Sequence, residues 1–430
     1  MIDKKLYGDL KNSIDSIKIF DTHEHLMFES ERRQKTLDFF IFFNGYASTD
    51  LMSSGLANEE MDRLKDPGLD LKRKWDIFNP YWEHIKNTGY AKVIKIALED
   101  IYGVESIDLK NIEKVTEKIK EYKNTEYYED ILSKRCKIEF ILNDIDLDEI
   151  GLEIRAPDAD YFLSVMRNDE LFELNTAEKL RKVEDKYNLS IDSLTDFVNL
   201  VDSNFEKRKE SIHAFKIGIA YNRSILFEDV SFSEAEKSFL NVLKLQSYDS
   251  FSDSVSLFEI KPFQDYMYHY CIRKAISNNL PVQIHTGILE GNYNDIRNSN
   301  PLLLTDLLLK YREGKFDLFH IGYPYTDELI AMIKMYPNGY INLCWIPEIS
   351  AHLYKNTLNL LIDIIPSNKI FGFGGDYLFV EGTYAAQKIA RQALLEVLYD
   401  RVACKYFTFE EAIEFAEKVL YKNPKSVYSS

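Results

Sequence analysis

The sequence contains little glycine, proline or cysteine. Its 430 residues include 17 glycines, 11 prolines and four cysteines. This composition excludes a collagen-like chain, and a content of 45% hydrophobic and 29% charged residues excludes wholesale disorder. We therefore expect an ordinary globular protein with few loops, many helices and a large core.

The four cysteines, Cys136, Cys271, Cys344 and Cys404, lie far apart and form no CxxC pair. Neither a disulfide framework nor a four-cysteine zinc site fits this spacing. The pattern predicts reduced, buried thiols of a cytosolic protein.

Long apolar runs and an excess of positive charge are also absent. No stretch approaches the roughly 20 apolar residues of a membrane span, and residues 1–20 lack the apolar core of a signal peptide. The 53 basic and 70 acidic residues give a net charge of −17, which repels nucleic acid and anionic membranes at long range. We expect a soluble, cytoplasmic protein whose partner is a small-molecule substrate, with no nucleic-acid or membrane partner.

Eight short apolar runs alternate with longer amphipathic stretches. Their lengths and their Val, Ile and Phe content are typical of buried parallel strands. The runs are residues 17–21, 137–142, 161–166, 214–219, 281–285, 316–320, 340–345 and 370–373. Helical patterns over residues 305–311, 326–335, 358–365 and 385–399 follow the last four runs. This alternation predicts an α/β fold, the (β/α)8 TIM barrel.

The chain is longer than a typical barrel of roughly 250 residues, so part of it must be inserted. We predict one domain over residues 1–430, with a helical insertion at 27–130 after the first strand and a second insertion at 228–260. Within the first insertion, residues 72–87 and 111–124 have helical patterns.

The first predicted strand ends in Asp21-Thr22-His23-Glu24-His25. Residues two apart share one face of a strand, so His23 and His25 can face one metal ion while Glu24 points away. An HxH motif alone arises by chance in many chains, and it needs support from other residues.

Further polar residues stand at or near the ends of four other predicted strands. Lys216 lies in the fourth, His285 ends the fifth, His320 ends the sixth, and Asp376 follows the eighth. Because barrel active sites lie at the carboxyl ends of the strands, these side chains should meet at one mouth. Imidazole and carboxylate groups bind zinc and related divalent ions. The pattern therefore predicts a metal site.

This order of residues resembles the metal-site pattern of the amidohydrolase superfamily, which runs HxH, Lys, His, His and Asp on successive strands. More closely, the sequence resembles the amidohydrolase-2 branch, which includes domains fused to glutamine synthetase in some plants and fungi. The stretches at 87–90, 101–103 and 220–223 also resemble that branch. A more distant resemblance to uronate isomerase includes the helical insertion. The resemblance covers about residues 17–400.

The resemblance implies that His23, His25, His285 and Asp376 bind a divalent metal, with zinc as the expected ion. It allows two roles for His320, which either polarises the substrate beside one metal or binds a second metal.

Lys216 stands where members with two metals carry a carboxylated lysine. An unmodified ammonium would repel a cation, so the alternative is an ion pair with the substrate or with Asp376. The sequence leaves open whether one or two ions bind.

The expected reaction is hydrolysis of a C–N or C–O bond in a small molecule. A bound divalent ion lowers the pKa of water from about 15.7 to about 7. Asp376 would accept the proton as general base and return it as general acid. The metal and His320 would stabilise the oxyanion.

Arg167, Tyr221 and Arg223 follow the third and fourth predicted strands and are candidates for binding an anionic substrate group. Trp345, at the end of the seventh, is a candidate for the pocket wall. The alternative for all four is a structural one, as solvated arginines and packed aromatics.

Two other functions compete with the hydrolase. One is a sugar-acid isomerase or related lyase, which the insertion after the first strand favours. The other is a catalytically silent barrel that serves as a binding module. The sequence also leaves open the substrate and whether the chain forms a homo-oligomer.

Overall fold

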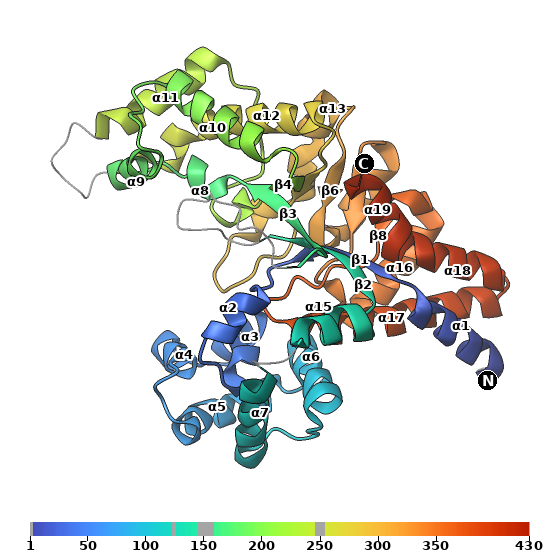
Figure 1. Cartoon of the computed structure of the whole chain (residues 1–430). Coiled ribbons are helices and arrows are strands. Elements are labelled where there is room, and N and C mark those ends of the chain that lie inside the picture. Colours follow the sequence, from blue (N-terminus) through green and yellow to red (C-terminus); the bar gives the residue numbers. More distant parts are fainter. Residues whose placement is uncertain (1–2, 123–125, 145–158, 246–253, 430) are drawn as a thin grey trace.

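The computed structural model describes residues 3–122, 126–144, 159–245 and 254–429 (Figure 1). Eight parallel strands form one sheet in which each strand pairs with the next along the chain. The strands are β1 Ile19–Glu24, β2 Ile138–Asn143, β3 Phe162–Arg167, β4 Ile212–Ile217, β5 Val282–Ile284, β6 Phe316–Leu318, β7 Gly339–Asn342 and β8 Ile370–Phe371. Each predicted run overlaps one strand, and the predicted (β/α)8 barrel is confirmed.

The two edge strands of the sheet come together and nearly close the barrel. The backbone N–H of Thr22 donates to the carbonyl of Phe373 at 3.2 Å, and that of Asp376 donates to the carbonyl of His23 at 2.8 Å. These bonds join the end of β1 to the loop after β8. The same bonds bring the HxH motif beside Asp376.

The fifth to eighth predicted strands are longer than those observed, and in the sixth and seventh the chain leaves the sheet early. After β6, His320 and Ile321 have φ values of 57° and 49°, and after β7 Trp345 has a φ of 66°. Left-handed backbone cannot continue a strand. The runs 316–320 and 340–345 therefore end as loops that turn their side chains into the mouth or its surroundings.

Helices surround the strands, and the predicted helical patterns lie within or overlap them. The observed α-helices before β1 and after β3 to β8 are α1 Lys4–Ser16, α8 Asp169–Phe172, α9 Ala177–Tyr187, α10 Leu194–Arg208, α11 Phe232–Leu245, α12 Leu257–Ser277, α13 Thr305–Lys310, α14 Thr326–Met335, α15 Ile346–Ile349, α16 Ala351–Ile364, α17 Val380–Ala403, α18 Phe409–Glu417 and α19 Asn423–Tyr428.

Among the described residues, six α-helices lie between β1 and β2. They are α2 Glu29–Gln34, α3 Tyr46–Ser53, α4 Asn58–Lys65, α5 Leu71–Ile85, α6 Gly89–Ala97 and α7 Leu109–Tyr122, and in Figure 1 they gather below the sheet, with α6 next to α17. Residues 123–124 of the predicted helix 111–124 and residues 246–253 of the predicted second insertion lie outside the described residues. The division into one domain with two insertions stays a prediction.

The chain also contains short 3-10 and π-helical segments. They are η1 Phe39–Phe43, η2 Leu98–Tyr102, η3 Glu129–Arg135, η4 Ile219–Tyr221, η5 Ile296–Ser299, η6 Pro301–Leu304, η7 Phe319–Gly322, η8 Ser367–Lys369 and η9 Lys418–Lys422.

Polar side chains fill the barrel interior behind the mouth. Asp317 of β6 accepts hydrogen bonds from the Tyr428 hydroxyl and from the Asn342 amide, the latter at 2.8 Å. Gln283 of β5 donates to the Tyr428 hydroxyl at 3.0 Å and to the carbonyl of Thr22 at 3.1 Å. The last helix, α19, thus inserts a tyrosine into the barrel.

The four cysteines are free thiols, as the sequence predicts. Cys136, Cys271 and Cys344 are buried, but the prediction of burial is wrong for Cys404. Cys404 follows the end of α17 and is exposed there. None of the helices among the described residues has the length and apolar character needed to span a membrane.

Candidate metal centre

The predicted metal ligands gather at the carboxyl ends of the strands. His23 lies in β1 and His25 follows it, His285 follows β5, His320 lies in η7, and Asp376 follows β8. Asp376, like His320, has left-handed backbone, with a φ of 54°. The turn at His320 follows β6 directly, and the turn at Asp376 lies in the loop between β8 and α17, so local backbone geometry turns these side chains into the mouth.

The HxH motif and Asp376 form a compact group. Nε2 of His23 and Nε2 of His25 each lie 3.4 Å from Oδ1 of Asp376. One ligand atom from each residue lies within 4.8 Å of the others, a spacing that could hold a metal ion. His23 and Asp376 are buried, and His25 is partly buried.

The other oxygen of Asp376 faces the second pair of histidines. Nε2 of His320 lies 3.6 Å from Oδ2 of Asp376 and 3.4 Å from Nδ1 of His285. One carboxylate thus stands between two histidine pairs, the pair from β1 and the pair from β5 and β6.

Three of these rings hydrogen-bond to backbone carbonyls through the nitrogen that faces away from the centre. Nδ1 of His25 bonds to Asp144 O at 2.6 Å, Nε2 of His285 to Ile288 O at 2.8 Å, and Nδ1 of His320 to Cys344 O at 3.1 Å. A carbonyl only accepts, so each of these nitrogens carries the proton. The opposite nitrogens then present lone pairs to the centre, as metal-binding histidines do. The donor set therefore fits a divalent cation.

Electrostatics favour the neutral form of the rings. Burial, with the nearby Lys216, holds the pKa of His23 well below its ordinary value. Burial lowers the pKa of His285 strongly and that of His320 to about 4. Neutral imidazole is the form that binds a metal.

Lys216 projects from β4 into the same buried region. Its Nζ lies 3.4 Å from the centroid of the Phe319 ring and has no hydrogen-bond partner among the described residues. Burial lowers the pKa of the amine to about 8. A buried amine without a hydrogen bond is costly, and a bound group at the centre would supply its missing partner.

A cavity of about 390 Å³ opens above the predicted metal ligands, and we call it the mouth cavity. Besides His23, His25, His285, Asp376 and Lys216, it is lined by Gly45, Tyr46, Asp144, Arg167, Gly218, Tyr221, Glu290 and Leu378. This volume lies at the lower end of the range for small-molecule sites.

Two of the four predicted substrate-binding residues line the mouth cavity. The Nε of Arg167 lies 2.6 Å from Asp169, and its Nη1 lies 3.5 Å from Asp144. The Tyr221 hydroxyl accepts a hydrogen bond from the backbone N–H of Glu290 at 3.2 Å. Arg167 thus brings a cation to the cavity, and Tyr221 forms part of its wall.

Arg223 and Trp345 are not among the residues that line this cavity. Arg223 is buried and donates to Gln264 at 2.8 Å and to Asp265 at 2.7 Å, so carboxylate and amide groups of α12 already occupy its guanidinium. Trp345 is buried beneath the mouth, with its ring centroid 5.1 Å from that of His320 and 4.5 Å from that of Tyr46. It supports these side chains from behind.

Three polar residues that line the mouth cavity, Tyr46, Asp144 and Glu290, were not predicted from the sequence. Asp144 directly follows β2, so the same strand-end rule would have found it. Tyr46 donates from its hydroxyl to the carbonyl of Asp376. It comes from α3, far from any strand end, and no local pattern in the sequence indicates this contact.

Behind the ligands, the acidic residues of the first motif support the loop that carries Asp376. Asp21 accepts from the backbone N–H of His23 at 3.2 Å and from that of Gly375 at 3.3 Å. Glu24 points away from the mouth, as predicted, and accepts from the backbone N–H of Tyr377 at 2.6 Å. These carboxyl groups tie β1 to the loop after β8.

Part of the chain is similar to a known protein family. Residues 254–429 match the amidohydrolase family. The resemblance predicted from the sequence is confirmed. The amidohydrolase segment contains His285, His320 and Asp376, while the HxH motif and Lys216 precede it. This match supports an amidohydrolase segment over residues 254–429, and the likeness to solved barrels described next supports the fold.

Part of the chain is also similar to a curated protein. A stretch of 176 residues is 31% identical to Protein fluG of Emericella nidulans and makes up 40% of this chain. It covers 20% of that protein, so the chain spans about a fifth of the length of this curated relative.

Solved structures share the fold at low identity. A uronate isomerase from Thermotoga maritima has a TM-score of 0.75 at 16% identity, covering 99% of this chain and 98% of its own. A glucuronate isomerase from Caulobacter crescentus has a TM-score of 0.75 at 15% identity, covering 99% and 94%. A candidate metal-dependent hydrolase from Lactobacillus casei has a TM-score of 0.67 at 16% identity, covering 98% and 97%.

Proposed function

We propose that the protein is a metal-dependent hydrolase that cleaves a C–N or C–O bond of a small molecule. One observation carries the proposal. Nε2 of His23 and of His25 face one oxygen of the buried Asp376 carboxylate, Nε2 of His320 faces the other, and Nδ1 of His285 lies 3.4 Å from Nε2 of His320. This arrangement has the geometry and charge of a cation site at a barrel mouth.

His23, His25 and Asp376 would hold the first ion, and His285 and His320 lie where they would hold a second. The Lys216 amine, which has no hydrogen-bond partner among the described residues, stands beside both histidine pairs, and as a carbamate it would change from a repelling cation into an anionic ligand. We therefore favour a two-ion centre with carboxylated Lys216. The bound ion lowers the pKa of water and so supplies a nucleophile at neutral pH.

The remaining chemistry belongs to side chains of this chain. Asp376 would accept the proton of the attacking water and return it to the leaving group. The hydrogen bond from Nδ1 of His320 to Cys344 O leaves Nε2 of the neutral ring without a proton. This favours a ligand role for His320 over hydrogen-bond donation to an oxyanion. Arg167 would hold an anionic group of the substrate.

Metal content and turnover of paired variants test the proposal. We expect His23→Ala and His285→Ala to lose bound metal by elemental analysis and to lose turnover in a screen of amides, lactones and deaminase substrates. His84→Ala, on the exposed surface of α5, should retain both. Full activity of chelator-stripped protein would contradict the proposal.

The state of Lys216 has a separate test. We expect wild-type protein prepared with bicarbonate to bind two ions per chain and to gain the mass of one CO2 in native mass spectrometry. Lys216→Met should lack the added mass and bind fewer ions. One ion beside an unmodified Lys216 amine in a crystal structure would instead support the ion-pair role.

A sugar-acid isomerase is the second candidate function. The likeness to two uronate isomerases over nearly the whole chain, and an arginine in the mouth cavity that could bind a sugar carboxylate, favour it. Incubation with D-glucuronate and D-galacturonate and assay for ketose would decide. Ketose formation would support the isomerase, and its absence would reject this candidate.

A further inference from the structure

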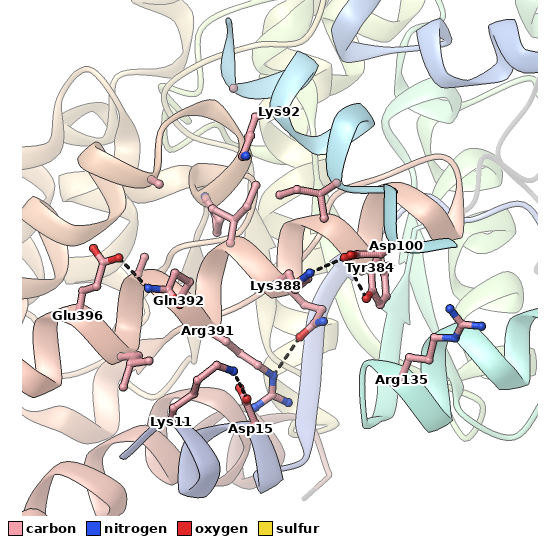
Figure 2. A pocket seen from close by; sticks show the side chains of 18 of the residues that line it. Lys11, Asp15, Lys92, Asp100, Arg135, Tyr384, Lys388, Arg391, Gln392 and Glu396 are labelled. Atoms are coloured by element: carbon pink, nitrogen blue, oxygen red, sulfur yellow. Dashed lines mark hydrogen bonds and ion pairs between the residues drawn. The ribbon is translucent and has the colours of Figure 1, made fainter. Parts of the chain in front are cut away.

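A second cavity lies away from the mouth, and we call it the outer cavity. It has a volume of about 790 Å³ and is lined by residues of α1, α6, α16 and α17, together with Arg135 and Lys137 near the start of β2 (Figure 2). It shares no lining residue with the mouth cavity. Its size is within the range of small-molecule sites.

The outer cavity is cationic in an acidic protein. Seven lysines and arginines and four acidic residues line it, whereas the whole chain has a net charge of −17. The basic residues are Lys11, Lys92, Arg135, Lys137, Lys355, Lys388 and Arg391. A concave surface of one sign raises the local concentration of ions of the opposite sign.

Four of the seven cations already have carboxylate partners, as Figure 2 shows for two of them. The pairs are Lys11 with Asp15, Lys388 with Asp100, Lys355 with Glu396 and Arg135 with Asp130. Among the described residues, the remaining cations, Lys92, Lys137 and Arg391, make no ion pair.

Arg391 is the most informative of these three, because its side chain is buried at 7% exposure. It donates to Gln387 at 2.9 Å, to Ile17 O at 2.7 Å, to Cys136 O at 3.2 Å and to Ile14 O. All four acceptors are neutral, and one of its five N–H groups is left over. The carboxylate of Asp15 acts on Arg391 from a distance and is itself paired with Lys11. A buried charge without a direct carboxylate partner is costly, and an anion in the cavity would compensate it.

Lys92 and Lys137 add two exposed charges from different sides of the chain. Lys92 lies on α6 and Lys137 immediately before β2, and their side chains are exposed. Between the charges, the walls are apolar, formed by Ile96, Pro347, Ala351, Ile389, Ala393 and Leu395. A ligand for this site needs both a negative group and an apolar body.

We propose that the outer cavity binds a small organic anion, a phosphate or carboxylate joined to an apolar group, with Arg391, Lys92 and Lys137 opposing its charge. The ligand would rest on elements that support the metal centre. Gly89 lines the cavity, and the ring of the next residue, Tyr90, stacks on Trp345 with centroids 6.5 Å apart. The helix of Arg391, α17, follows the loop of Asp376. This placement suits an effector.

Isothermal titration of the full chain with three matched probes tests the proposal. Phenyl phosphate and phenylacetate carry an anion on the same apolar ring, and benzyl alcohol carries none. We expect at least one anion to bind with a stoichiometry of one, more weakly at high salt, and benzyl alcohol not to bind. The comparison of the two anions shows which group the site prefers.

Variants assign the binding to the cavity. The double variant Lys92→Glu/Lys137→Glu should bind the preferred anion about tenfold more weakly or worse. Lys72→Glu/Lys110→Glu makes the same charge change at exposed positions outside the cavity and should bind within about twofold of wild type. Arg167→Gln, in the mouth cavity, should also bind normally.

Two outcomes would overturn the proposal. One is that neither anion binds to the wild type. The other is that binding survives Lys92→Glu/Lys137→Glu but is lost in Arg167→Gln, which would place the anion in the mouth. The milder Lys92→Gln/Lys137→Gln should lose less affinity for the anion. It replaces the charge-reversal variant in the titration if that variant has a lowered melting temperature. The readout needs neither metal nor turnover, so it is independent of the proposed hydrolase function.

Discussion

At the scale of single residues, the histidines of the centre are oriented by backbone carbonyls. Ile288 O and Cys344 O belong to the loops after β5 and β7, and Asp144 O follows β2. Each carbonyl selects the protonated nitrogen of one ring, so the lone pair of the other nitrogen points inward. The histidine side chain and the backbone carbonyl that orients it are thus both needed to form a metal ligand.

Asp376 is the residue on which both histidine pairs converge, and its replacement separates proton transfer from metal binding. We expect Asp376→Asn to reduce kcat by about 10²-fold or more, since general acid and base catalysis contributes roughly 10²–10⁴-fold. Part of the metal should remain, held by the histidines. Turnover and elemental analysis check this, with the exposed Asp306→Asn as control. Near-normal turnover of Asp376→Asn would exclude a catalytic role.

At the scale of elements, the ends of strands and helices decide where functional side chains stand. Left-handed residues follow β6 at His320 and β7 at Trp345, and Asp376 is left-handed within the loop between β8 and α17. Helix α12 leads into β5, which His285 follows. It begins with a capping box in which the Ser256 side chain accepts from Glu259 N, and the Glu259 side chain accepts from Ser256 N.

This capping box has a measurable contribution to stability. We expect Ser256→Ala to lower the free energy of unfolding by about 1 kcal/mol, because it removes an acceptor for the backbone N–H at the helix start. Ser277→Ala, at the other end of α12, removes an exposed hydroxyl that donates to Lys274 O and accepts from the Asn278 side-chain amide. It should change the free energy of unfolding by less than about 0.5 kcal/mol. Urea denaturation checks both. Equal effects would contradict the role of the cap.

At the scale of the whole molecule, a buried ion pair joins the helices after β1 to the barrel. Arg32 of α2 donates to Glu381 of α17 at 2.6 and 3.0 Å. The hydroxyls of Tyr102 and Tyr127 donate to the same carboxylate at 2.6 and 2.9 Å. Four side chains from distant parts of the chain thus meet at one buried charge.

Removal of one partner should be much worse than removal of both. Arg32→Met leaves Glu381 buried without its counter-ion and should cost about 3–5 kcal/mol. The double variant Arg32→Met/Glu381→Met should recover part of this loss, because no unpaired charge remains. Chemical denaturation of the two variants and of Glu381→Met completes the cycle. Additive losses would show that the two residues are not coupled.

Inside the barrel, burial raises the pKa of Asp317 from an ordinary value of 3.8 to about 7. Between these values the native protein holds a proton that the unfolded chain has released, so the free energy of unfolding falls as pH rises from about 4 to about 7. The pKa difference bounds this loss at about 4 kcal/mol. We expect Asp317→Asn to lose less stability than the wild type over this pH range.

The measurement is the free energy of unfolding at pH 4.5 and pH 7.5 for wild type, Asp317→Asn and the exposed Asp306→Asn. Other buried carboxyl groups remain in all three proteins, so the difference between the variants isolates Asp317. The same pH dependence in Asp317→Asn and in wild type would show that Asp317 is not the protonated group.

Much of the fold and of the candidate site was predictable. The strands are buried on both faces and read as continuous apolar runs, so their positions and order follow from the sequence. The HxH motif, His285, His320 and Asp376 stand at strand ends, and parallel strands bring such ends together. Arg223 also follows a strand, but its side chain points to α12, where it forms an ion pair with Asp265.

The sequence by itself determined the eight strands, the barrel and the candidate metal ligands that meet at its mouth, because each depends on local periodicity and on strand order. The tertiary structure alone decided which ring nitrogens face inward, that Tyr46 reaches Asp376, that Lys216 lies buried without a hydrogen-bond partner among the described residues, and that cations without carboxylates line a second cavity. These features depend on contacts between residues far apart in the chain, and no local pattern encodes such contacts.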